Sequence, residues 1–239
     1  MIPKIIHYCW FGKGTKPELA IKCIASWKKY LPEYEYIEWN EDNFNFDMFP
    51  YAKQALEAKK YAYITDVVRL YALKEFGGIY MDTDVEVLKP LDVFLHHAAF
   101  SGFESNSSLP TGLMAAEKGS AWASDLLSYY EGKSFLDDNG KPILTPNTNV
   151  ITEMMLEEGF ELNNKFQEKE GYVAFYPDDV FCAKSSETGK ITITSNTYSI
   201  HHFSGSWLPK SVKIRHEIIK VLYKFFGKSV VDNLKKILR

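Results

Sequence analysis

Apolar and polar positions along the first eighty residues change period several times, and these changes predict an order of elements. Strands are expected at residues 5–10 and 34–39, the second with an alternating pattern, and helices at residues 18–30 and 51–60. Strands that alternate with helices in this way call for a sheet with a parallel centre and helices on both faces. The fold class is therefore expected to be α/β.

The next segment carries the most informative pattern. Residues 63–76 favour a helix, Gly77-Gly78 stops it, and the short apolar strand 79–81 leads into Asp82-Thr83-Asp84. Ligands of open α/β sheets bind beyond the carboxyl ends of the strands. We therefore expect Asp82-Thr83-Asp84 to share one crevice with Trp10, which ends the first strand.

Four charged residues, Asp66, Arg69, Asp82 and Asp84, lie in a segment otherwise apolar enough to be buried. Buried charges pair with one another, bind a metal or do chemistry. Asp82 and Asp84 are two residues apart in extended chain and project to the same side, an arrangement that suits Mg²⁺ or Mn²⁺ and, through the cation, a diphosphate. Arg69 suits a phosphate or the carboxylates, and Asp66 suits sugar hydroxyls. Taken alone, Asp82-Thr83-Asp84 is equally compatible with a polar turn between two strands.

Length and composition agree with a globular α/β protein. The chain has 239 residues, 46% of them hydrophobic and 15% aromatic, enough for one α/β domain with an appendage. No apolar run is long enough to cross a bilayer, and the first residues predict a strand rather than a signal peptide. Cys9, Cys23 and Cys182 lack metal-type spacing, so we expect reduced thiols and a cytoplasmic location.

Charge divides the chain into two parts. Residues 208–239 hold nine basic and two acidic side chains, a net charge of +7, which leaves residues 1–207 at −10 because the whole chain carries −3. We expect a catalytic domain at 1–207 and a basic amphipathic helical tail at 208–239, since apolar positions recur at helical spacing there. The tail helices either dock on the domain with their lysines solvated or lie as a peripheral contact on an anionic membrane.

The central motif resembles that of a known family. Residues 65–69 and 77–84 are similar to the signature of the "DXD sugar-binding" glycosyltransferases of family 32, which include capsular polysaccharide transferases and yeast α-mannosyltransferases and are related to the glucosyltransferase domains of the large clostridial toxins. Residues 2–12 resemble the family's opening strand and residues 201–207 its closing one, so the resemblance covers residues 1–207. It implies the nucleotide-sugar fold called GT-A, a mixed sheet flanked by helices.

The resemblance also implies roles for residues at the predicted crevice. Asp66 and Arg69 match contacts to the donor sugar, and Trp10 matches an aromatic that stacks on the base, although Trp10 by itself is more typical of a core aromatic. Three further polar residues rank below these, because loop residues of this kind are usually solvated: Glu104, Asn147 and Asn149.

The closing segment contains two adjacent histidines. By resemblance His202 is a ligand of the cation together with Asp82 and Asp84, whereas His201 points the other way as a core histidine. Ser206 and Trp207 are expected to close over the diphosphate, each donating one hydrogen bond.

Together, these expectations predict a metal-dependent, retaining glycosyltransferase. It would move a hexose from a nucleoside diphosphate sugar, UDP-hexose or alternatively GDP-mannose, onto a saccharide acceptor, lipid-linked or free, in capsular or cell-surface polysaccharide synthesis. Retention of the anomeric configuration follows from the resemblance alone. The expected location is the cytoplasm or the inner face of the cell membrane, and no nucleic-acid partner is expected.

Two other functional classes remain. Phosphatases and phosphotransferases of the haloacid dehalogenase class also begin at an Asp-x-Asp after an apolar strand, but they need Thr or Val two places after the second Asp, where this chain has Glu86. A non-catalytic sugar-binding module would have little reason to keep Asp66, Arg69 and two carboxylates buried together.

Overall fold

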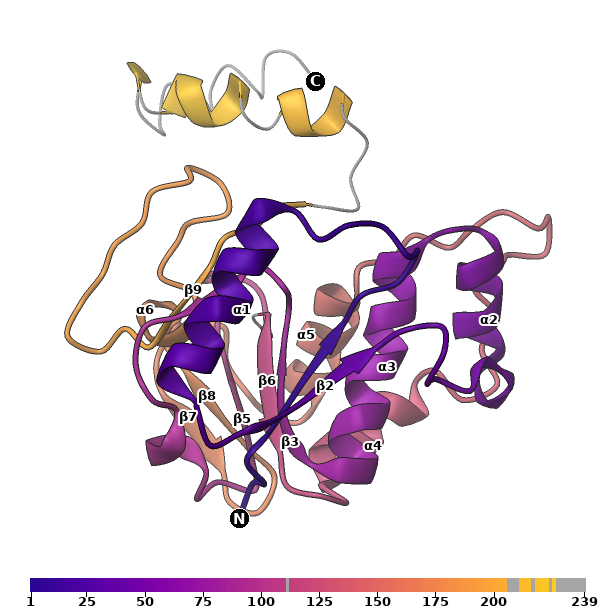
Figure 1. Ribbon diagram of the computed structural model, residues 1–239, viewed down its shortest axis with the longest axis horizontal. Helices are drawn as coiled ribbons and strands as arrows, with labels where there is room; N and C mark the ends of the chain where they lie inside the picture. The colour runs from indigo at the N-terminus through magenta and orange to yellow at the C-terminus, as the bar shows by residue number, and fades with distance from the viewer. Residues whose placement is uncertain (111, 206–210, 216–217, 224, 227–239) are drawn as a thin grey trace.

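The computed structural model describes residues 1–110, 112–205, 211–215, 218–223 and 225–226. Within them, seven strands form one sheet in the order β2-β1-β3-β6-β5-β8-β7, and β4 and β9 form a separate pair (Figure 1). The strands are β1 (Ile5–Cys9), β2 (Glu35–Trp39), β3 (Gly78–Met81), β4 (Val85–Val87), β5 (Ala99–Gly102), β6 (Leu113–Ala116), β7 (Gln167–Lys169), β8 (Val173–Tyr176) and β9 (Ser199–His201). The helices are α1 (Glu18–Tyr30), α2 (Pro50–Glu57), α3 (Tyr61–Phe76), α4 (Ala121–Ser128), α5 (Asn147–Glu157) and α6 (Asp178–Phe181).

The directions of the strands bring distant parts of the chain to one edge of the sheet. Strands β2, β1 and β3 are mutually parallel, β6 runs antiparallel between β3 and β5, and β5 is parallel to β8. Five strands therefore end at the same edge. There the chain continues into Trp10 after β1, Asp82 after β3 and Glu104 just beyond β5. The predicted crevice beyond the carboxyl ends of the strands lies at this edge.

Each face of the sheet is covered by its own apolar core. Helices α2, α3, α4 and α5 pack on one face, where Tyr80 of β3 points, and the cluster continues to Phe175 of β8. Helices α1 and α6 and strand β4 pack on the other face, against Ile79 and Met81. Because both faces are covered, the central strands are continuous apolar runs rather than alternating ones.

The turn from α3 into β3 requires its two glycines. Gly77 and Gly78 have φ values of +69° and +112°, in the region that side chains disfavour. A Cβ added to Gly78 would lie 2.5 Å from the carbonyl oxygen of Ile5, and one added to Gly77 would lie 2.6 Å from the backbone nitrogen of Lys118. Only this pair lets the helix lead directly into the strand that ends at Asp82.

The structure confirms the expected α/β class, with the mixed, helix-flanked sheet that a GT-A fold requires. Helix α1 has the predicted bounds, and α3 begins two residues earlier than predicted. Helix α3 is buried on most sides, which is why its sequence lacks a single apolar stripe.

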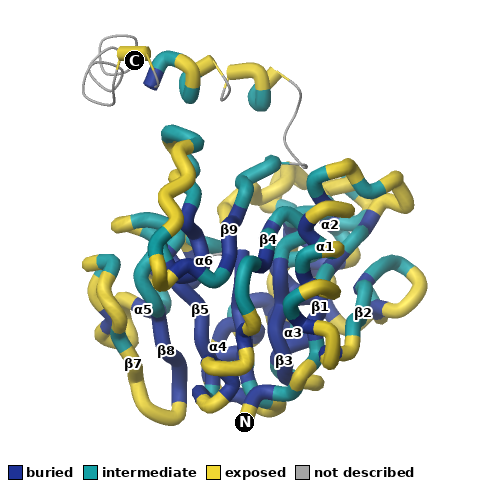
Figure 2. The backbone as a smooth tube through the Cα atoms, turned by 60° about the vertical axis from the view of Figure 1, so that its left-hand side comes forward, coloured by how far each residue is buried: buried dark blue, intermediate teal, exposed yellow. Residues whose placement is uncertain are grey.

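The tail predicted at 208–239 lies mostly outside the described residues. Its described stretches, 211–215, 218–223 and 225–226, are helical, and most of their residues are exposed or half-buried (Figure 2). Among all helices in the described part of the chain, none has the length and apolarity needed to cross a membrane. The division into domains at 207 stays a prediction.

Candidate metal and donor-sugar site

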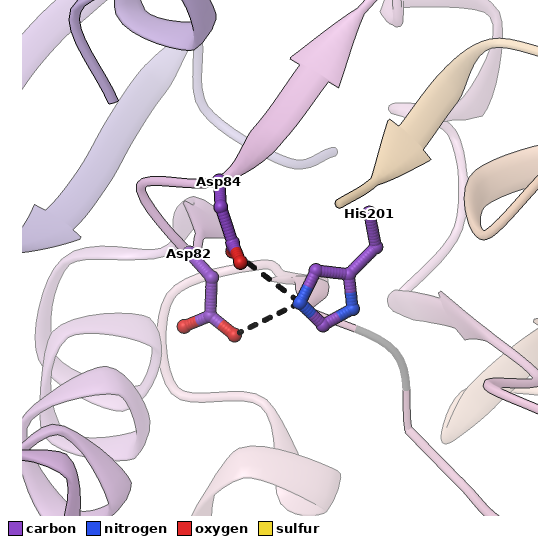
Figure 3. Close-up of side chains that lie close together, drawn as sticks. All are labelled: Asp82, Asp84 and His201. Atoms are coloured by element: carbon purple, nitrogen blue, oxygen red, sulfur yellow. Dashed lines mark ion pairs between the residues drawn. The ribbon is translucent and has the colours of Figure 1, made fainter. Parts of the chain in front are cut away.

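Two carboxylates and one imidazole meet at the edge where the strands end (Figure 3). Asp82 follows β3, Asp84 precedes β4, and His201 is the last residue of β9, which pairs with β4 so that His201 lies opposite Val85. Nε2 of His201 is 3.3 Å from Oδ1 of Asp84 and 3.9 Å from Oδ2 of Asp82. One potential ligand atom from each residue lies within 4.8 Å of the others.

The second oxygen of each carboxylate is held by the protein. The backbone N–H of Ser204 donates to Oδ2 of Asp84 at 2.7 Å, and the hydroxyl of Tyr80 donates to Oδ1 of Asp82 at 2.8 Å. Asp82 and Asp84 thus each keep one oxygen directed toward Nε2 of His201. These two hydrogen bonds orient the carboxylates, as hydrogen bonds to metal-binding side chains do in metal sites.

The residues present fit a divalent cation. Two carboxylate oxygens and an imidazole nitrogen are ligands that suit Mn²⁺, and the carboxylates alone suit Mg²⁺. Gly112 leaves the neighbouring space open, because a Cβ there would lie 2.9 Å from Oδ2 of Asp82 and 3.1 Å from Nε2 of His201. A larger residue at position 112 would intrude on the group.

Charge pairing dominates the electrostatics of the group. Burial by itself would raise the pKa of Asp84, but the charge and hydrogen bond of His201 and the hydrogen bonds of Ser204 hold that pKa well below its usual range. Burial would lower the pKa of His201, yet Asp84 raises it well above its ordinary value. A cation bound here would take over the pairing with the carboxylates, and His201 would release its proton to serve as a ligand.

The structure places His201, and not His202 as predicted, beside the two aspartates. Nε2 of His202 lies 2.8 Å from Oε2 of Glu86, and Glu86 also pairs with Lys22 at 3.0 Å. His201 is the last residue of β9 and points to the aspartates, whereas His202 directly follows the strand and points to Glu86. His201, expected to be a core histidine, thus occupies the place that the sequence had assigned to His202.

Arg69 lies beside the aspartates, on the helix that precedes them. Its Nη2 is 3.3 Å from Oδ1 of Asp66 and 3.5 Å from Oδ1 of Asp82, and its guanidinium lies 4.8 Å from the centre of the Tyr80 ring. Thr65 fixes it further, by accepting hydrogen bonds from Nε at 3.0 Å and from Nη2 at 3.1 Å. Burial raises the pKa of Asp66 to about 7, although the charge of Arg69 acts against this rise. The structure therefore brings together the four charged residues predicted from the sequence.

These groups open onto a cavity of about 610 Å³. Five of the predicted site residues line it: Trp10, Asp66, Arg69, Asp82 and Asp84. Ser206 and Trp207 lie outside the described residues. Trp10 is half-buried rather than a core residue, and its indole N–H donates to the carbonyl oxygen of Gly14 at 2.6 Å.

Residues 17–101 match the family described as "Glycosyltransferase sugar-binding region containing DXD motif". Over this segment, about a third of the chain, the sequence is similar to that family. The match contains α3, the glycine pair and both motif aspartates, so the resemblance seen in the sequence is confirmed there.

Curated proteins and solved structures with partial similarity to this chain were found. Inositol phosphoceramide mannosyltransferase 3 of Schizosaccharomyces pombe is 34% identical over 122 residues, which are 49% of this chain and 34% of that protein. The chain spans about a third of the length of the curated relatives it matches. Among solved structures, a glycosyltransferase involved in glycosylation of the major capsid of PBCV-1 is 13% identical and covers 91% of this chain and all of its own, with a TM-score of 0.48. The PaToxG glycosyltransferase is 20% identical, covers 66% of this chain and 69% of its own, and has a TM-score of 0.47.

Some residues that line the cavity were given low rank, or were not identified, in the analysis of the sequence. Glu104 is half-buried in the wall, where desolvation raises its pKa, and Asn147 lines the same cavity, whereas Asn149 is exposed. Lys220, from the described part of the tail, also lines the cavity. Glu104 had a usable signal, since it follows the end of a parallel strand as Asp82 does; Lys220 had none in the local pattern.

Proposed function

We propose that this chain is a metal-dependent, retaining glycosyltransferase that moves a hexose from a nucleoside diphosphate sugar to a hydroxyl of a saccharide acceptor. The observation that carries the proposal is the group Asp82, Asp84 and His201 at the wall of a cavity that also contains Asp66 and Arg69. The family match over residues 17–101 supports transfer of a sugar rather than of a phosphate.

Each residue of the group then has a chemical role. Asp82, Asp84 and His201 would hold Mn²⁺ or Mg²⁺, which when bound neutralises a diphosphate and makes the nucleotide a better leaving group. Arg69 places a permanent positive charge beside Asp82, and Thr65 and Asp66 hold its guanidinium in position. Asp66 accepts a hydrogen bond from a sugar hydroxyl when its carboxyl is ionised.

Two aromatic residues of the cavity wall suit the nucleotide base. Trp10 and Tyr61 both line the cavity, and the ring of Tyr61 fills the space beside Gly12, where a Cβ would lie 2.6 Å from it. Aromatic side chains at the end of β1 provide surfaces on which a base can stack. We assign base stacking to Trp10.

Two donors are proposed for the first tests, UDP-hexose and GDP-mannose. The name of the Schizosaccharomyces pombe relative, an inositol phosphoceramide mannosyltransferase, supports inclusion of the mannosyl donor. We further propose a role in capsular or other cell-surface polysaccharide synthesis at the cytoplasmic side of the membrane. The phosphatase and sugar-binding alternatives are not favoured, because the family match is to transferases.

The test is release of nucleoside diphosphate from these donors with Mn²⁺ and a saccharide acceptor. A phosphatase would release inorganic phosphate, and a binding module would release nothing. We expect Asp84→Asn to lower turnover by about a hundredfold or more, because an amide of equal size loses the charge that holds the cation. Chelation of the metal should abolish wild-type turnover and added Mn²⁺ should restore it. Normal metal-dependent turnover in a folded Asp84→Asn protein would contradict the assignment.

A further inference from the structure

The carboxamide of Asn147 is a polar group without a partner in the cavity wall. Asn147 is the first residue of α5 and is only 7% exposed, and its buried Nδ2 makes no hydrogen bond within the described part of the chain. An unpaired buried N–H costs about 1–3 kcal/mol. Native proteins rarely keep such a group unless it has a functional role or a partner that binds it.

Buried hydrogen bonds hold helix α5 in place, so a change of partner by the Asn147 side-chain amide requires no movement of the backbone. One turn further on, Oγ1 of Thr152 accepts a hydrogen bond from the N–H of Leu109 at 2.9 Å and donates one to its carbonyl oxygen at 2.9 Å. Both bonds are buried, and they attach α5 to the segment that continues into Pro110 of the cavity wall. Rotation about the last bond of the Asn147 side chain exchanges the positions of Nδ2 and Oδ1.

The start of α5 adds further donors at the same place. Pro146, Asn147 and Thr148 all line the cavity, and no side chain caps this end of the helix. The first N–H groups of a helix carry partial positive charge and favour an oxygen acceptor. This donor-rich end lies on a different element from Asp82, Asp84 and His201.

The wall of the same cavity contains carboxyl groups. These groups indicate whether a sugar hydroxyl or a phosphate binds there. Asp66 and Glu104 line the same cavity and accept hydrogen bonds when ionised. A sugar hydroxyl accepts from an amide N–H and donates to a carboxylate, so it satisfies both kinds of group. A phosphate oxygen only accepts, and carboxylates repel it.

We propose that Asn147, at the start of α5, is a specificity-determining residue that binds a hydroxyl of the donor hexose. The inference rests on the proposed function, because it places the sugar of a nucleoside diphosphate sugar at this end of the cavity. It also divides the cavity by chemistry: the diphosphate lies at Asp82, Asp84 and His201, and the hexose ring extends from there toward α5.

The test compares ligands that differ only in the hexose. Calorimetric titration with Mn²⁺ measures binding of UDP and UDP-glucose, and of GDP and GDP-mannose, to the wild type, Asn147→Ala, Asn147→Asp and Asn149→Ala. Asn149 is the matched control, since it lies in the same turn of α5 but is exposed. We expect both Asn147 variants to bind the preferred nucleotide sugar about five- to tenfold more weakly, while binding of the free diphosphate changes less than about twofold. Asn149→Ala should match the wild type for both ligands.

The outcomes separate the two proposals. Equal binding of the nucleotide sugar by wild type and both Asn147 variants would overturn the role of Asn147 and leave the proposed function intact. Weaker binding of the free diphosphate by the same factor would also overturn it, because the residue would then act on the fold or the nucleotide rather than on the sugar. Failure of the wild type to bind any of these ligands would overturn the proposed function and the inference together.

Discussion

Two adjacent residues, His201 at the end of β9 and His202 directly after it, point in different directions and therefore have different surroundings. The pairing of β9 with β4 sets which histidine points to which side: His201 lies opposite Val85 and reaches the aspartates, whereas His202 reaches Glu86. A one-residue shift of this register would exchange their roles. The sequence contains both histidines and the motif, but not the register.

The exchange of roles can be tested by a pair of substitutions. We expect His201→Ala to weaken Mn²⁺-dependent binding of nucleoside diphosphate by about tenfold or more, since loss of even an outer-shell partner of a metal ligand costs that much. His202→Ala should change the binding less than about threefold, because its contact is with Glu86 and the salt bridge to Lys22 remains. Titration of each variant with Mn²⁺ and diphosphate measures both effects, and a larger loss in His202→Ala would restore the original sequence assignment.

At the scale of elements, a buried histidine joins the first strands to the turn before the motif. His7 of β1 is fully buried; its Nε2 lies 2.8 Å from the carbonyl oxygen of Gly77, and its Nδ1 accepts a hydrogen bond from Nε1 of Trp39 in β2 at 3.2 Å. These partners require a neutral ring with its proton on Nε2. Burial accordingly lowers the pKa of His7 from 6.5 to about 4.

This lowered pKa makes the stability of the fold depend on pH. Between pH 6.5 and about 4 the unfolded chain binds a proton at His7 that the folded chain does not, so the free energy of unfolding should fall as the pH is lowered through this range. The loss from His7 should reach ~2–3 kcal/mol near pH 4.5. His7→Gln keeps a donor and an acceptor but does not titrate, so urea unfolding at about pH 7 and about pH 4.5 should show a smaller difference for the variant by that amount. An equal pH dependence in both proteins would show that His7 is not the group responsible.

The elements themselves were largely predictable, because their signals are local. The glycine pair marks the end of α3, and the apolar run after it marks β3, whatever the rest of the chain does. Asp66 and Arg69 could be assigned to one helix face from their spacing. The place of Asn147 could not be assigned in this way, since it depends on the attachment of Thr152 to Leu109, 43 residues earlier in the chain.

At the scale of the whole molecule, the described part of the tail lies beside the mouth of the cavity. Lys220 lines the cavity, and its side chain lies 3.3 Å from the place of a Cβ on Gly189, in the loop between α6 and β9. The four apolar residues Ile214, Ile218, Val221 and Phe225 recur at helical spacing and are 61%, 55%, 52% and 76% exposed. Two apolar residues of the same loop, Ile191 and Ile193, are exposed as well. The tail thus presents an apolar surface next to a site that we propose acts on saccharides.

We propose the membrane alternative for the tail, and the exposed apolar side chains of its described part support this proposal. Exposed apolar side chains between basic residues are the features of a helix that lies on an anionic bilayer, where each lysine near the surface contributes about 1 kcal/mol. We therefore expect the full chain to sediment with vesicles of phosphatidylcholine and phosphatidylserine at low salt. It should be released at high salt, because screening weakens the attraction of the lysines.

Substitution of the apolar surface tests this expectation without removal of Lys220 from the cavity. The double variant Val221→Ser with Phe225→Ser should lose most vesicle binding at low salt, since it keeps every charge but loses apolar area that would enter the bilayer. Val93→Ser is the control, because Val93 is similarly exposed, at 58%, but lies before β5 in the domain. Binding by the double variant equal to that of the control would assign the attraction to charge alone. Absence of binding by the wild type, with lower thermal stability of the double variant, would instead show that these residues pack on the protein and that the tail docks on the domain.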